Sequence, residues 1–254
     1  MKKILFVLVV LGGIFSSTVF AQENPLLISD FWQTATVEDV AGVLDQGANI
    51  NDHSLGKMTP LHLAAKHSTM EVVTLLLDRG ADINNRDNEI GASPLHSAIL
   101  HNDTPEMVAL LLDRGADIEA LLHYPIDDGL SPLYLAAGKS SPEVIALLLN
   151  EGANIEAKTK KDGVTPLHVA AGRRATEAVS SLLDAGADIE ARNKQGWTPL
   201  HAAAKWSKTP EVIALLLDRG ANAGAQKDDG KTAFDIVEEN EHLRNTEAYE
   251  LLQR

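Results

Sequence analysis

Cysteine is absent from the 254-residue sequence, which excludes disulfide bonds, zinc–thiolate sites and cysteine nucleophiles. Aromatic residues are sparse at 4%, so we expect the core to be filled mainly by leucine, valine and alanine. Basic residues are outnumbered, because 22 Lys and Arg against 36 Asp and Glu give a net charge of −14. That balance disfavours binding of the whole surface to nucleic acid or to an anionic membrane.

The sequence also lacks a hydrophobic run long enough to span a bilayer. The apolar run at residues 4–15 has 12 residues, whereas a spanning helix needs about 20. It follows two lysines and precedes the small side chains of Val19 and Ala21, the pattern of a secretory signal peptide. We therefore expect a bacterial signal peptide over residues 1–21, cut after Ala21, and a periplasmic or secreted mature chain without membrane attachment. An uncleaved N-terminal anchor is the alternative.

One stretch recurs along the rest of the chain. Its first copy, Thr59 to Asp82, reads as a helix that opens Thr-Pro-Leu-His, a polar break, and a second helix that closes Asp-Arg-Gly. A threonine cap followed by a first-turn proline favours a helix start, and Gly80 can adopt the left-handed conformation that closes a helix end. The opening proline stands at positions 60, 94, 132, 166 and 199, in steps of 34, 38, 34 and 33. A period near 33 residues indicates a stack of repeats.

With five such copies, the chain resembles the ankyrin-repeat family over nearly everything after residue 28. The resemblance implies an all-α solenoid of helix-turn-helix units joined by β-hairpin fingers. The expected units are a linker over 22–28, an N-terminal capping repeat over 29–58, full repeats over 59–92, 93–130, 131–164, 165–197 and 198–231, and a C-terminal capping repeat over 232–254.

Four histidines recur at one position of the repeat, and together they could suggest a metal site. Packed helices lie about 8–10 Å apart, whereas ligands that share one zinc ion each lie about 2 Å from it. The four imidazoles therefore cannot meet on one metal ion. The resemblance implies instead that each bonds within its own turn and to the adjacent unit. The structural motif residues are Thr59, His62, His96, Thr165, His168, Thr198 and His201.

Other polar residues also have expected structural roles. Asp82, Asp117 and Asp188 each follow a Gly-Ala pair, where they are expected to support the turn rather than perform acid–base chemistry. Second helices are expected to be capped by the residue before a proline, as at Thr104, Ser141 and Thr209. The fifth unit has Ala175 at the aligned position, so its second helix is expected to fray first.

One finger is longer than the others. Gly115 to Pro132 is 17 residues, whereas Gly186 to Pro199 is 13. Leu122 and Tyr124 in this finger offer apolar area to a partner, since insertions in repeat proteins map to loops that are often on the binding side. The alternative is that Leu122 tucks back against the stack and leaves Tyr124 as an ordinary surface residue.

Basic residues are concentrated between Lys158 and Lys208, where nine stand against five acids. Two tryptophans lie in this stretch, and exposed tryptophan and arginine are typical interface anchors. We expect the fifth and sixth units to bind an acidic or aromatic segment of a partner, unless the stretch is a solvated mixed face with Trp197 packed on a neighbouring finger. The expected contact residues here are Trp197, Trp206, Arg173, Arg174 and Lys205.

The function that the resemblance implies is that of a protein-binding scaffold, acting through its concave face and fingers. No enzyme motif occurs, so catalysis and cofactors are not expected, and nucleic acid is not an expected partner. A protective or chaperone-like factor for an envelope enzyme and a secreted effector that binds a host protein are the alternatives. A monomer is expected, although the acidic N-terminal half could contact the basic half of another copy.

Overall fold

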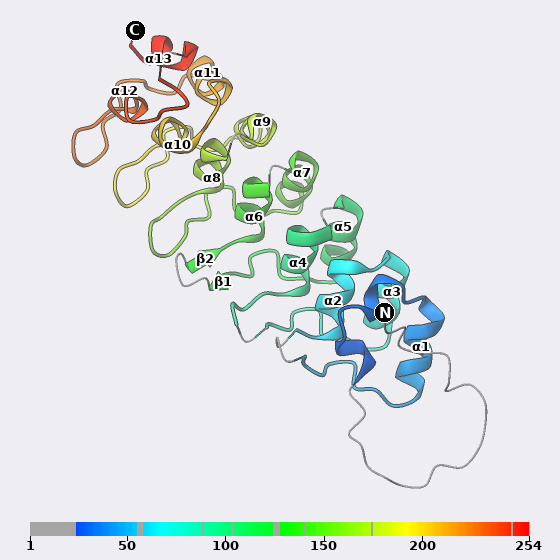
Figure 1. Ribbon diagram of the computed structural model, residues 1–254. Helices are drawn as coiled ribbons and strands as arrows, with labels where there is room; N and C mark the ends of the chain where they lie inside the picture. The colour runs from blue at the N-terminus through cyan, green and yellow to red at the C-terminus, as the bar shows by residue number, and fades with distance from the viewer. Residues whose placement is uncertain are drawn as a thin grey trace, which may run out of the picture.

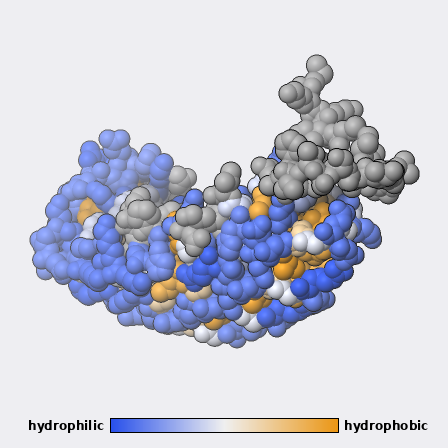
Figure 2. Space-filling model, turned by 90° about the horizontal axis from the view of Figure 1, so that it is seen from below, coloured by the Kyte–Doolittle hydropathy of each residue, from blue (hydrophilic) through white to orange (hydrophobic). Residues whose placement is uncertain are grey.

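The computed structural model describes residues 24–54, 58–87, 89–102, 104–123, 128–139, 141–173, 175–244 and 246–253. The expected signal peptide and its cleavage site lie outside these residues. The described helices stack side by side in two layers along an elongated body (Figure 1). Its surface is mostly hydrophilic on the face seen in Figure 2, with small hydrophobic patches spread along it.

The first helices of the repeats form the inner layer, from which the fingers project (Figure 1). The inner helices are α2 (Pro60–His67), α4 (Pro94–Ser97), α6 (Pro132–Lys139), α8 (Pro166–Gly172), α10 (Pro199–Trp206) and α12 (Ala233–Val237). The outer helices are α1 (Val37–Asp45), α3 (Met70–Asp78), α5 (Pro105–Asp113), α7 (Pro142–Asn150), α9 (Thr176–Asp184), α11 (Glu211–Asp218) and α13 (Glu247–Gln253). The solenoid expected from the repeat pattern is therefore confirmed.

The core is a series of thin layers between successive repeats. Each full repeat buries the leucine that follows its first-turn proline, such as Leu61 and Leu200, and small alanines in the same helix let neighbouring helices approach. In the second full repeat, α4 continues as one π-helical turn, η3 (Ala98–Asn102). This repeat has one residue more than the first between its two cap positions, and the wider turn accommodates it.

The fingers are hairpins tied to one another. The long finger contains the strand pair β1 (Leu122–His123) and β2 (Asp128–Leu130), antiparallel with Leu122 opposite Leu130. Other described fingers are closed by backbone hydrogen bonds, for example Asn193 N–H to the Trp197 carbonyl at 3.0 Å. Neighbouring fingers are joined in the same way, as by Lys194 N–H and the Asp162 carbonyl at 2.9 Å. The fingers thus form a connected edge rather than separate projections.

The N-terminal cap begins earlier than expected. Residues 24–28 were expected to belong to a linker, but they contain the 3-10 helix η1 (Pro25–Leu27), and Leu26 is fully buried. Trp32, in the 3-10 helix η2 (Phe31–Gln33), is also buried and donates its indole N–H to the Leu26 carbonyl at 3.1 Å. The large indole needs this cover because no earlier repeat packs against it.

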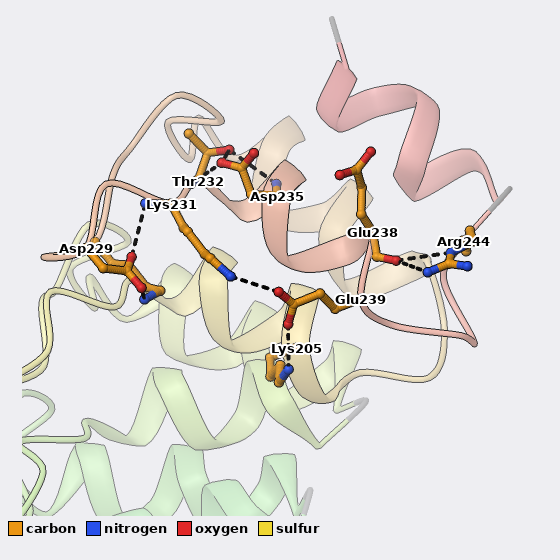
Figure 3. A network of polar contacts seen from close by, with 9 residues as sticks. Lys205, Asp229, Lys231, Thr232, Asp235, Glu238, Glu239 and Arg244 are labelled. Carbon is orange, nitrogen blue, oxygen red and sulfur yellow. Dashed lines mark hydrogen bonds and ion pairs between the residues drawn. The ribbon is translucent and has the colours of Figure 1, made fainter.

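The C-terminal cap is held by polar contacts to the last full repeat. The buried Asn240 amide donates to the carbonyls of Ala204 and Ser207, both at 2.9 Å. Figure 3 shows the Glu239 carboxylate between two ammonium groups, with Lys231 at 2.8 Å and Lys205 at 3.1 Å. Lys205 belongs to α10, so this ion pair joins the cap to the preceding inner helix.

The second helices begin differently from the expected capping pattern. Thr104 is the N-cap of α5, but its hydroxyl donates to the Asn102 side chain at 2.9 Å and accepts no hydrogen bond from the helix backbone. Helix α11 begins at Glu211 with Pro210 as N-cap, and a hydrogen bond to the Thr209 side chain lowers the pKa of Glu211. Since α5 also lacks a side-chain cap, the missing cap at Ala175 does not set α9 apart, and early fraying of α9 loses its expected cause.

Candidate partner-binding site

The two tryptophans of the basic stretch stack on each other. Trp197 closes the finger that precedes α10, and its backbone N–H donates to the Asn193 side chain at 2.9 Å. Trp206 is the last residue of α10. Their ring centroids lie 5.0 Å apart with 18° between the ring planes. Trp206 remains 57% exposed, the largest exposure among the large hydrophobic side chains in the described part of the chain.

A lysine from the next finger covers the Trp197 ring. The Lys227 ammonium lies 5.6 Å from the ring centroid, within range of a cation–π interaction. Lys227 also forms an ion pair with Asp229. Trp197 therefore packs on the neighbouring finger, as the alternative of a solvated mixed face expected, and it also stacks on Trp206.

A pocket of about 340 Å³ opens beside this stack. Gly172 lines it, at a position where other repeats carry Lys66, Leu100, Gly138 or Lys205. A Cβ atom at Gly172 would lie 3.5 Å from the Trp206 ring, so a longer side chain there would fill the space. The residues that line the pocket are Tyr134, Val164, His168, Val169, Gly172, Arg173, Asn193, Trp197 and Trp206.

Arg173 supplies the positive charge at the pocket. It follows α8 and is exposed. None of the other residues that line the pocket carries a carboxylate. Within the described residues, no hydrogen bond or ion pair of its guanidinium is found. Its neighbour Arg174, also an expected contact residue, lies outside the described residues.

Most other cations of the basic stretch serve the fold. Lys158 donates to the Arg192 carbonyl at 3.2 Å, and Arg192 donates to the Gln226 carbonyl at 2.8 Å. Lys160 pairs with Asp128 at 3.3 Å. Lys205, an expected partner contact, is held by Glu239 at 3.1 Å. The charge of the stretch remains, but these donors already tie one finger or repeat to the next.

Leu122 of the long finger does not offer the apolar surface that was expected of it. Leu122 is fully buried, because the strand pair turns its side chain toward the stack. It is therefore not an accessible contact residue, and the alternative in which it tucks back is the one observed. Tyr124 lies outside the described residues.

The recurrent histidines are structural in three repeats. The Nδ1 atom of His62 accepts from the Thr59 N–H at 3.2 Å and from its hydroxyl at 2.8 Å, and Nε2–H donates to the Ala92 carbonyl at 2.9 Å. The cross-repeat bonds of His168 and His201 reach the Trp197 and Lys231 carbonyls at 2.9 and 3.2 Å. Burial lowers the pKa of His168 to about 4, so the ring is neutral at pH 7.

The fourth histidine departs from this pattern. His96 makes the local bonds to Ser93, at 3.1 Å to its N–H and 2.7 Å to its hydroxyl. Its buried Nε2 atom has no hydrogen-bond partner among the described residues. The next finger is the long one, whose register shifts between Leu122 and His123. The Ala120 carbonyl is near enough to raise the pKa of His96 against the larger effect of burial, but it forms no well-aligned hydrogen bond with Nε2. Burial lowers the pKa of His96 to about 3.

The aspartates that follow the Gly-Ala pairs support their turns, as expected. Asp82 and Asp188 accept through Oδ1 from N–H groups two residues on, at 3.0 and 2.9 Å. Among the described residues, no group of three or more His, Cys, Asp or Glu side chains could hold a metal ion. The described helices also include none that is long and apolar enough to cross a bilayer.

Comparisons with known proteins agree with the repeat architecture. A family model for three copies of the ankyrin repeat matches residues 34–121 and 118–193, and a model for a single ankyrin repeat matches residues 195–228. The solved ankyrin repeat domain of human ASB11 superimposes with a TM-score of 0.75 and 28% identity, over 90% of this chain and 96% of that chain.

Known proteins of very different length are similar to parts of this chain. The Drosophila melanogaster Neurogenic locus Notch protein is 34% identical over 107 residues, which are 41% of this chain and 4% of that protein. A putative ankyrin repeat protein of fowlpox virus is 31% identical over 123 residues, 48% of this chain and 35% of that protein. One from Rickettsia bellii is 41% identical over 58 residues, 23% of this chain and 24% of that protein. The chain thus spans well under half of each relative, and it belongs to the ankyrin-repeat family.

Proposed function

We propose that this protein is an exported, monomeric scaffold that binds a protein partner at the pocket beside Trp206. Ankyrin repeats are in general protein-binding scaffolds without catalytic activity. The observation that carries the proposal is an indole that stays 57% exposed while a second indole holds it in place. Tryptophan and arginine dominate binding energy at protein interfaces, and a side chain that is already ordered loses little entropy on binding.

Partner capture tests the pocket. The mature protein and its Trp206→Ala variant are immobilised in parallel and exposed to a periplasmic extract and to host-cell lysate. We expect Trp206→Ala to lose the captured protein. Met70→Ala is the matched control because Met70 is also a large exposed hydrophobic side chain, at 41%, on the outer helix α3. Equal capture by wild type and Trp206→Ala would refute the pocket as the binding site.

The extract that yields the partner also decides between the alternatives. Capture from periplasm followed by improved survival of the captured enzyme would favour a protective factor, and capture only from host lysate would favour an effector. Export is proposed from the N-terminal sequence pattern alone. Mass spectrometry of the protein recovered from the periplasm or medium should give a mature N-terminus at Gln22, and a chain that retains residues 1–21 would refute cleavage.

A further inference from the structure

Charges are separated between the two layers of helices. Residues 60–67, 94–102, 132–139, 166–172 and 199–206, the inner layer of the five full repeats, contain no Asp or Glu. The outer helices α1, α3, α5, α7, α9 and α11 contain no Lys or Arg and carry acids in every one. A protein of net charge −14 therefore has one face of helices without negative charge.

One exposed position of the inner layer recurs along this face, and in two repeats it carries a cation, Lys139 and Arg173. Seven residues after each opening proline stand His67, His101, Lys139, Arg173 and Trp206, and all five are exposed. We call these five residues the inner row. Lys66 and Lys139 help to lower the pKa of His101 after the larger effect of burial, which places these side chains within electrostatic reach of one another.

Acidic residues limit the inner row at its C-terminal end. The next inner helix, α12, and the residues after it carry Asp235, Glu238 and Glu239. Figure 3 shows these acids together in the cap, where Glu239 already takes Lys205 and Lys231. An acidic ligand that follows the inner row is therefore attracted as far as Arg173 and repelled beyond Trp206, so the pocket at Trp206 is where such a ligand ends.

The spacing of the inner row matches an extended peptide. Neighbouring packed helices lie about 8–10 Å apart, and an extended chain advances about 3.3 Å per residue. Three residues of extended peptide therefore span about one repeat. Acidic side chains at every third position would meet Arg173 and Lys139, whose ammonium also donates to the Leu100 carbonyl at 2.9 Å. The side chain three positions beyond the acid at Arg173 would reach Trp206.

We infer that the inner row binds an extended acidic segment of a partner protein, with acids three residues apart and an aromatic side chain that enters the pocket beside Trp206. This inference rests on the proposed function and specifies the partner's chemistry. Arg173 contacts the acid nearest the pocket, because its guanidinium has no partner among the described residues. The pocket, about 340 Å³ and lined by two indoles, accepts the aromatic ring by stacking.

Synthetic peptides test the inference on the purified mature protein. The probe is a fluorescein-labelled 12-residue peptide of Gly, Ser and Glu with Glu at positions 1, 4 and 7 and Phe at position 10, and binding is measured by anisotropy at low salt. We expect it to bind at least about threefold tighter than a peptide of the same composition with the three Glu adjacent, and about tenfold tighter than one with Ala at position 10. Affinity should fall as salt rises.

Protein variants assign the contacts. Arg173→Gln should weaken the probe about three- to tenfold, whereas Arg79→Gln, on the far edge and paired with Asp45, should leave it unchanged. Gly172→Leu should fill the pocket and abolish the preference for Phe over Ala. Leu100 occupies this position two repeats earlier, in the turn η3. Gly42→Leu on α1, where a Cβ atom would touch nothing within 4 Å, is the control for an added leucine.

Each outcome decides between this inference and the proposed function. No binding of the probe at millimolar peptide, or equal binding of the spaced and adjacent Glu peptides, would overturn the inference while partner loss in Trp206→Ala would still support the proposed function. A 12-nucleotide oligothymidine that binds as tightly through Arg173 would overturn it in favour of nucleic acid. The probe could bind with the expected variant effects while Trp206→Ala leaves partner capture unaffected. That result would support the peptide site and refute the proposed function.

Discussion

At the scale of single residues, His62, His168 and His201 make their full set of hydrogen bonds only in the neutral form. Nδ1 accepts two hydrogen bonds, so the proton must reside on Nε2, where it is donated to the following repeat. Protonation would turn Nδ1 into a donor that faces an N–H group. Burial opposes the charged form as well, and it lowers the pKa of His62, His96, His168 and His201.

These lowered pKa values make the protein sensitive to mild acid. In the unfolded chain a histidine titrates near 6.5, but in the folded chain His168 does so only at about 4. Between these values the unfolded state binds more protons than the folded state. The contribution of the neutral ring to the free energy of unfolding is therefore fully present above pH 6.5 and is lost as pH falls toward 4. The loss is at most about 1.4 kcal/mol per pH unit for each such histidine. Urea unfolding from pH 7.5 to 4.5 measures it.

The variant His168→Asn should be less stable at pH 7.5 but lose less stability on acidification than the wild type. His242→Asn, at an exposed position of the C-terminal cap, should keep the wild-type dependence on pH. An identical pH slope in all three proteins would contradict a role for the buried imidazoles.

His96 offers a second comparison between equivalent residues. His62→Gln removes a hydrogen bond to the Ala92 carbonyl, whereas His96→Gln removes none from Nε2 among the described residues. A net hydrogen bond is worth about 1 kcal/mol. We therefore expect His62→Gln to lower the free energy of unfolding by about 1 kcal/mol more than His96→Gln in urea titrations, and the reverse order would show that Nε2 of His96 is satisfied.

At the scale of elements, the ends of the outer helices are joined by a ladder of ion pairs. The arginine that follows an outer helix pairs with the aspartate that ends the previous one: Arg79 with Asp45, Arg114 with Asp78, and Arg219 with Asp184, at 2.9, 2.9 and 2.7 Å. The ladder stops where Glu151 and Ala185 replace arginine. Glu151 stands where an arginine would pair with Asp113, so an acid takes the place of the cation there.

Glu151→Arg should extend the ladder by pairing with Asp113. Exposed ion pairs contribute only about 0.2–1 kcal/mol, so a gain in the free energy of unfolding of this size is expected at low salt, and it should shrink in 1 M salt. Ala185→Arg is the control, since its partner position holds Asn150, which is neutral. An equal gain in both variants would mean that the effect is not due to the new pair.

The inner helices were the part of the fold that the sequence predicted best. The opening Thr-Pro-Leu-His fixes both the cap and the first turn of an inner helix, so these helices begin where the motif begins. The start of α11 was misjudged by one residue, since Pro210 and not Thr209 is its N-cap. The pocket was missed as a cavity although its tryptophans were expected. Gly172 in place of a longer residue was the available signal.

At the scale of the whole molecule, a solenoid depends on its ends. Each repeat contacts only its neighbours, so a weakened cap unfolds locally before the rest of the stack. Trp32 is the largest fully buried side chain of the described residues, and it closes the N-terminal end. Its loss would open a cavity and remove the bond to the Leu26 carbonyl.

Trp32→Ala should therefore destabilise one end of the molecule. A loss of about 3–5 kcal/mol is expected for a buried tryptophan. Hydrogen exchange should increase most in α1 and α2 and progressively less toward α10. Trp206→Ala, at an exposed position, should leave exchange nearly unchanged throughout. Uniform acceleration in Trp32→Ala would show that the stack unfolds as a single cooperative unit.

The three tryptophans give this protein a built-in optical readout with two separate channels. Trp32 is sealed inside the N-terminal cap and should emit at short wavelength, whereas Trp206 is 57% exposed and stacked on Trp197. Occupancy of the pocket should shift or quench the second signal and leave the first unchanged. Loosening of the N-terminal cap should do the opposite, so unlabelled protein can report ligand arrival and the opening of that cap in one spectrum.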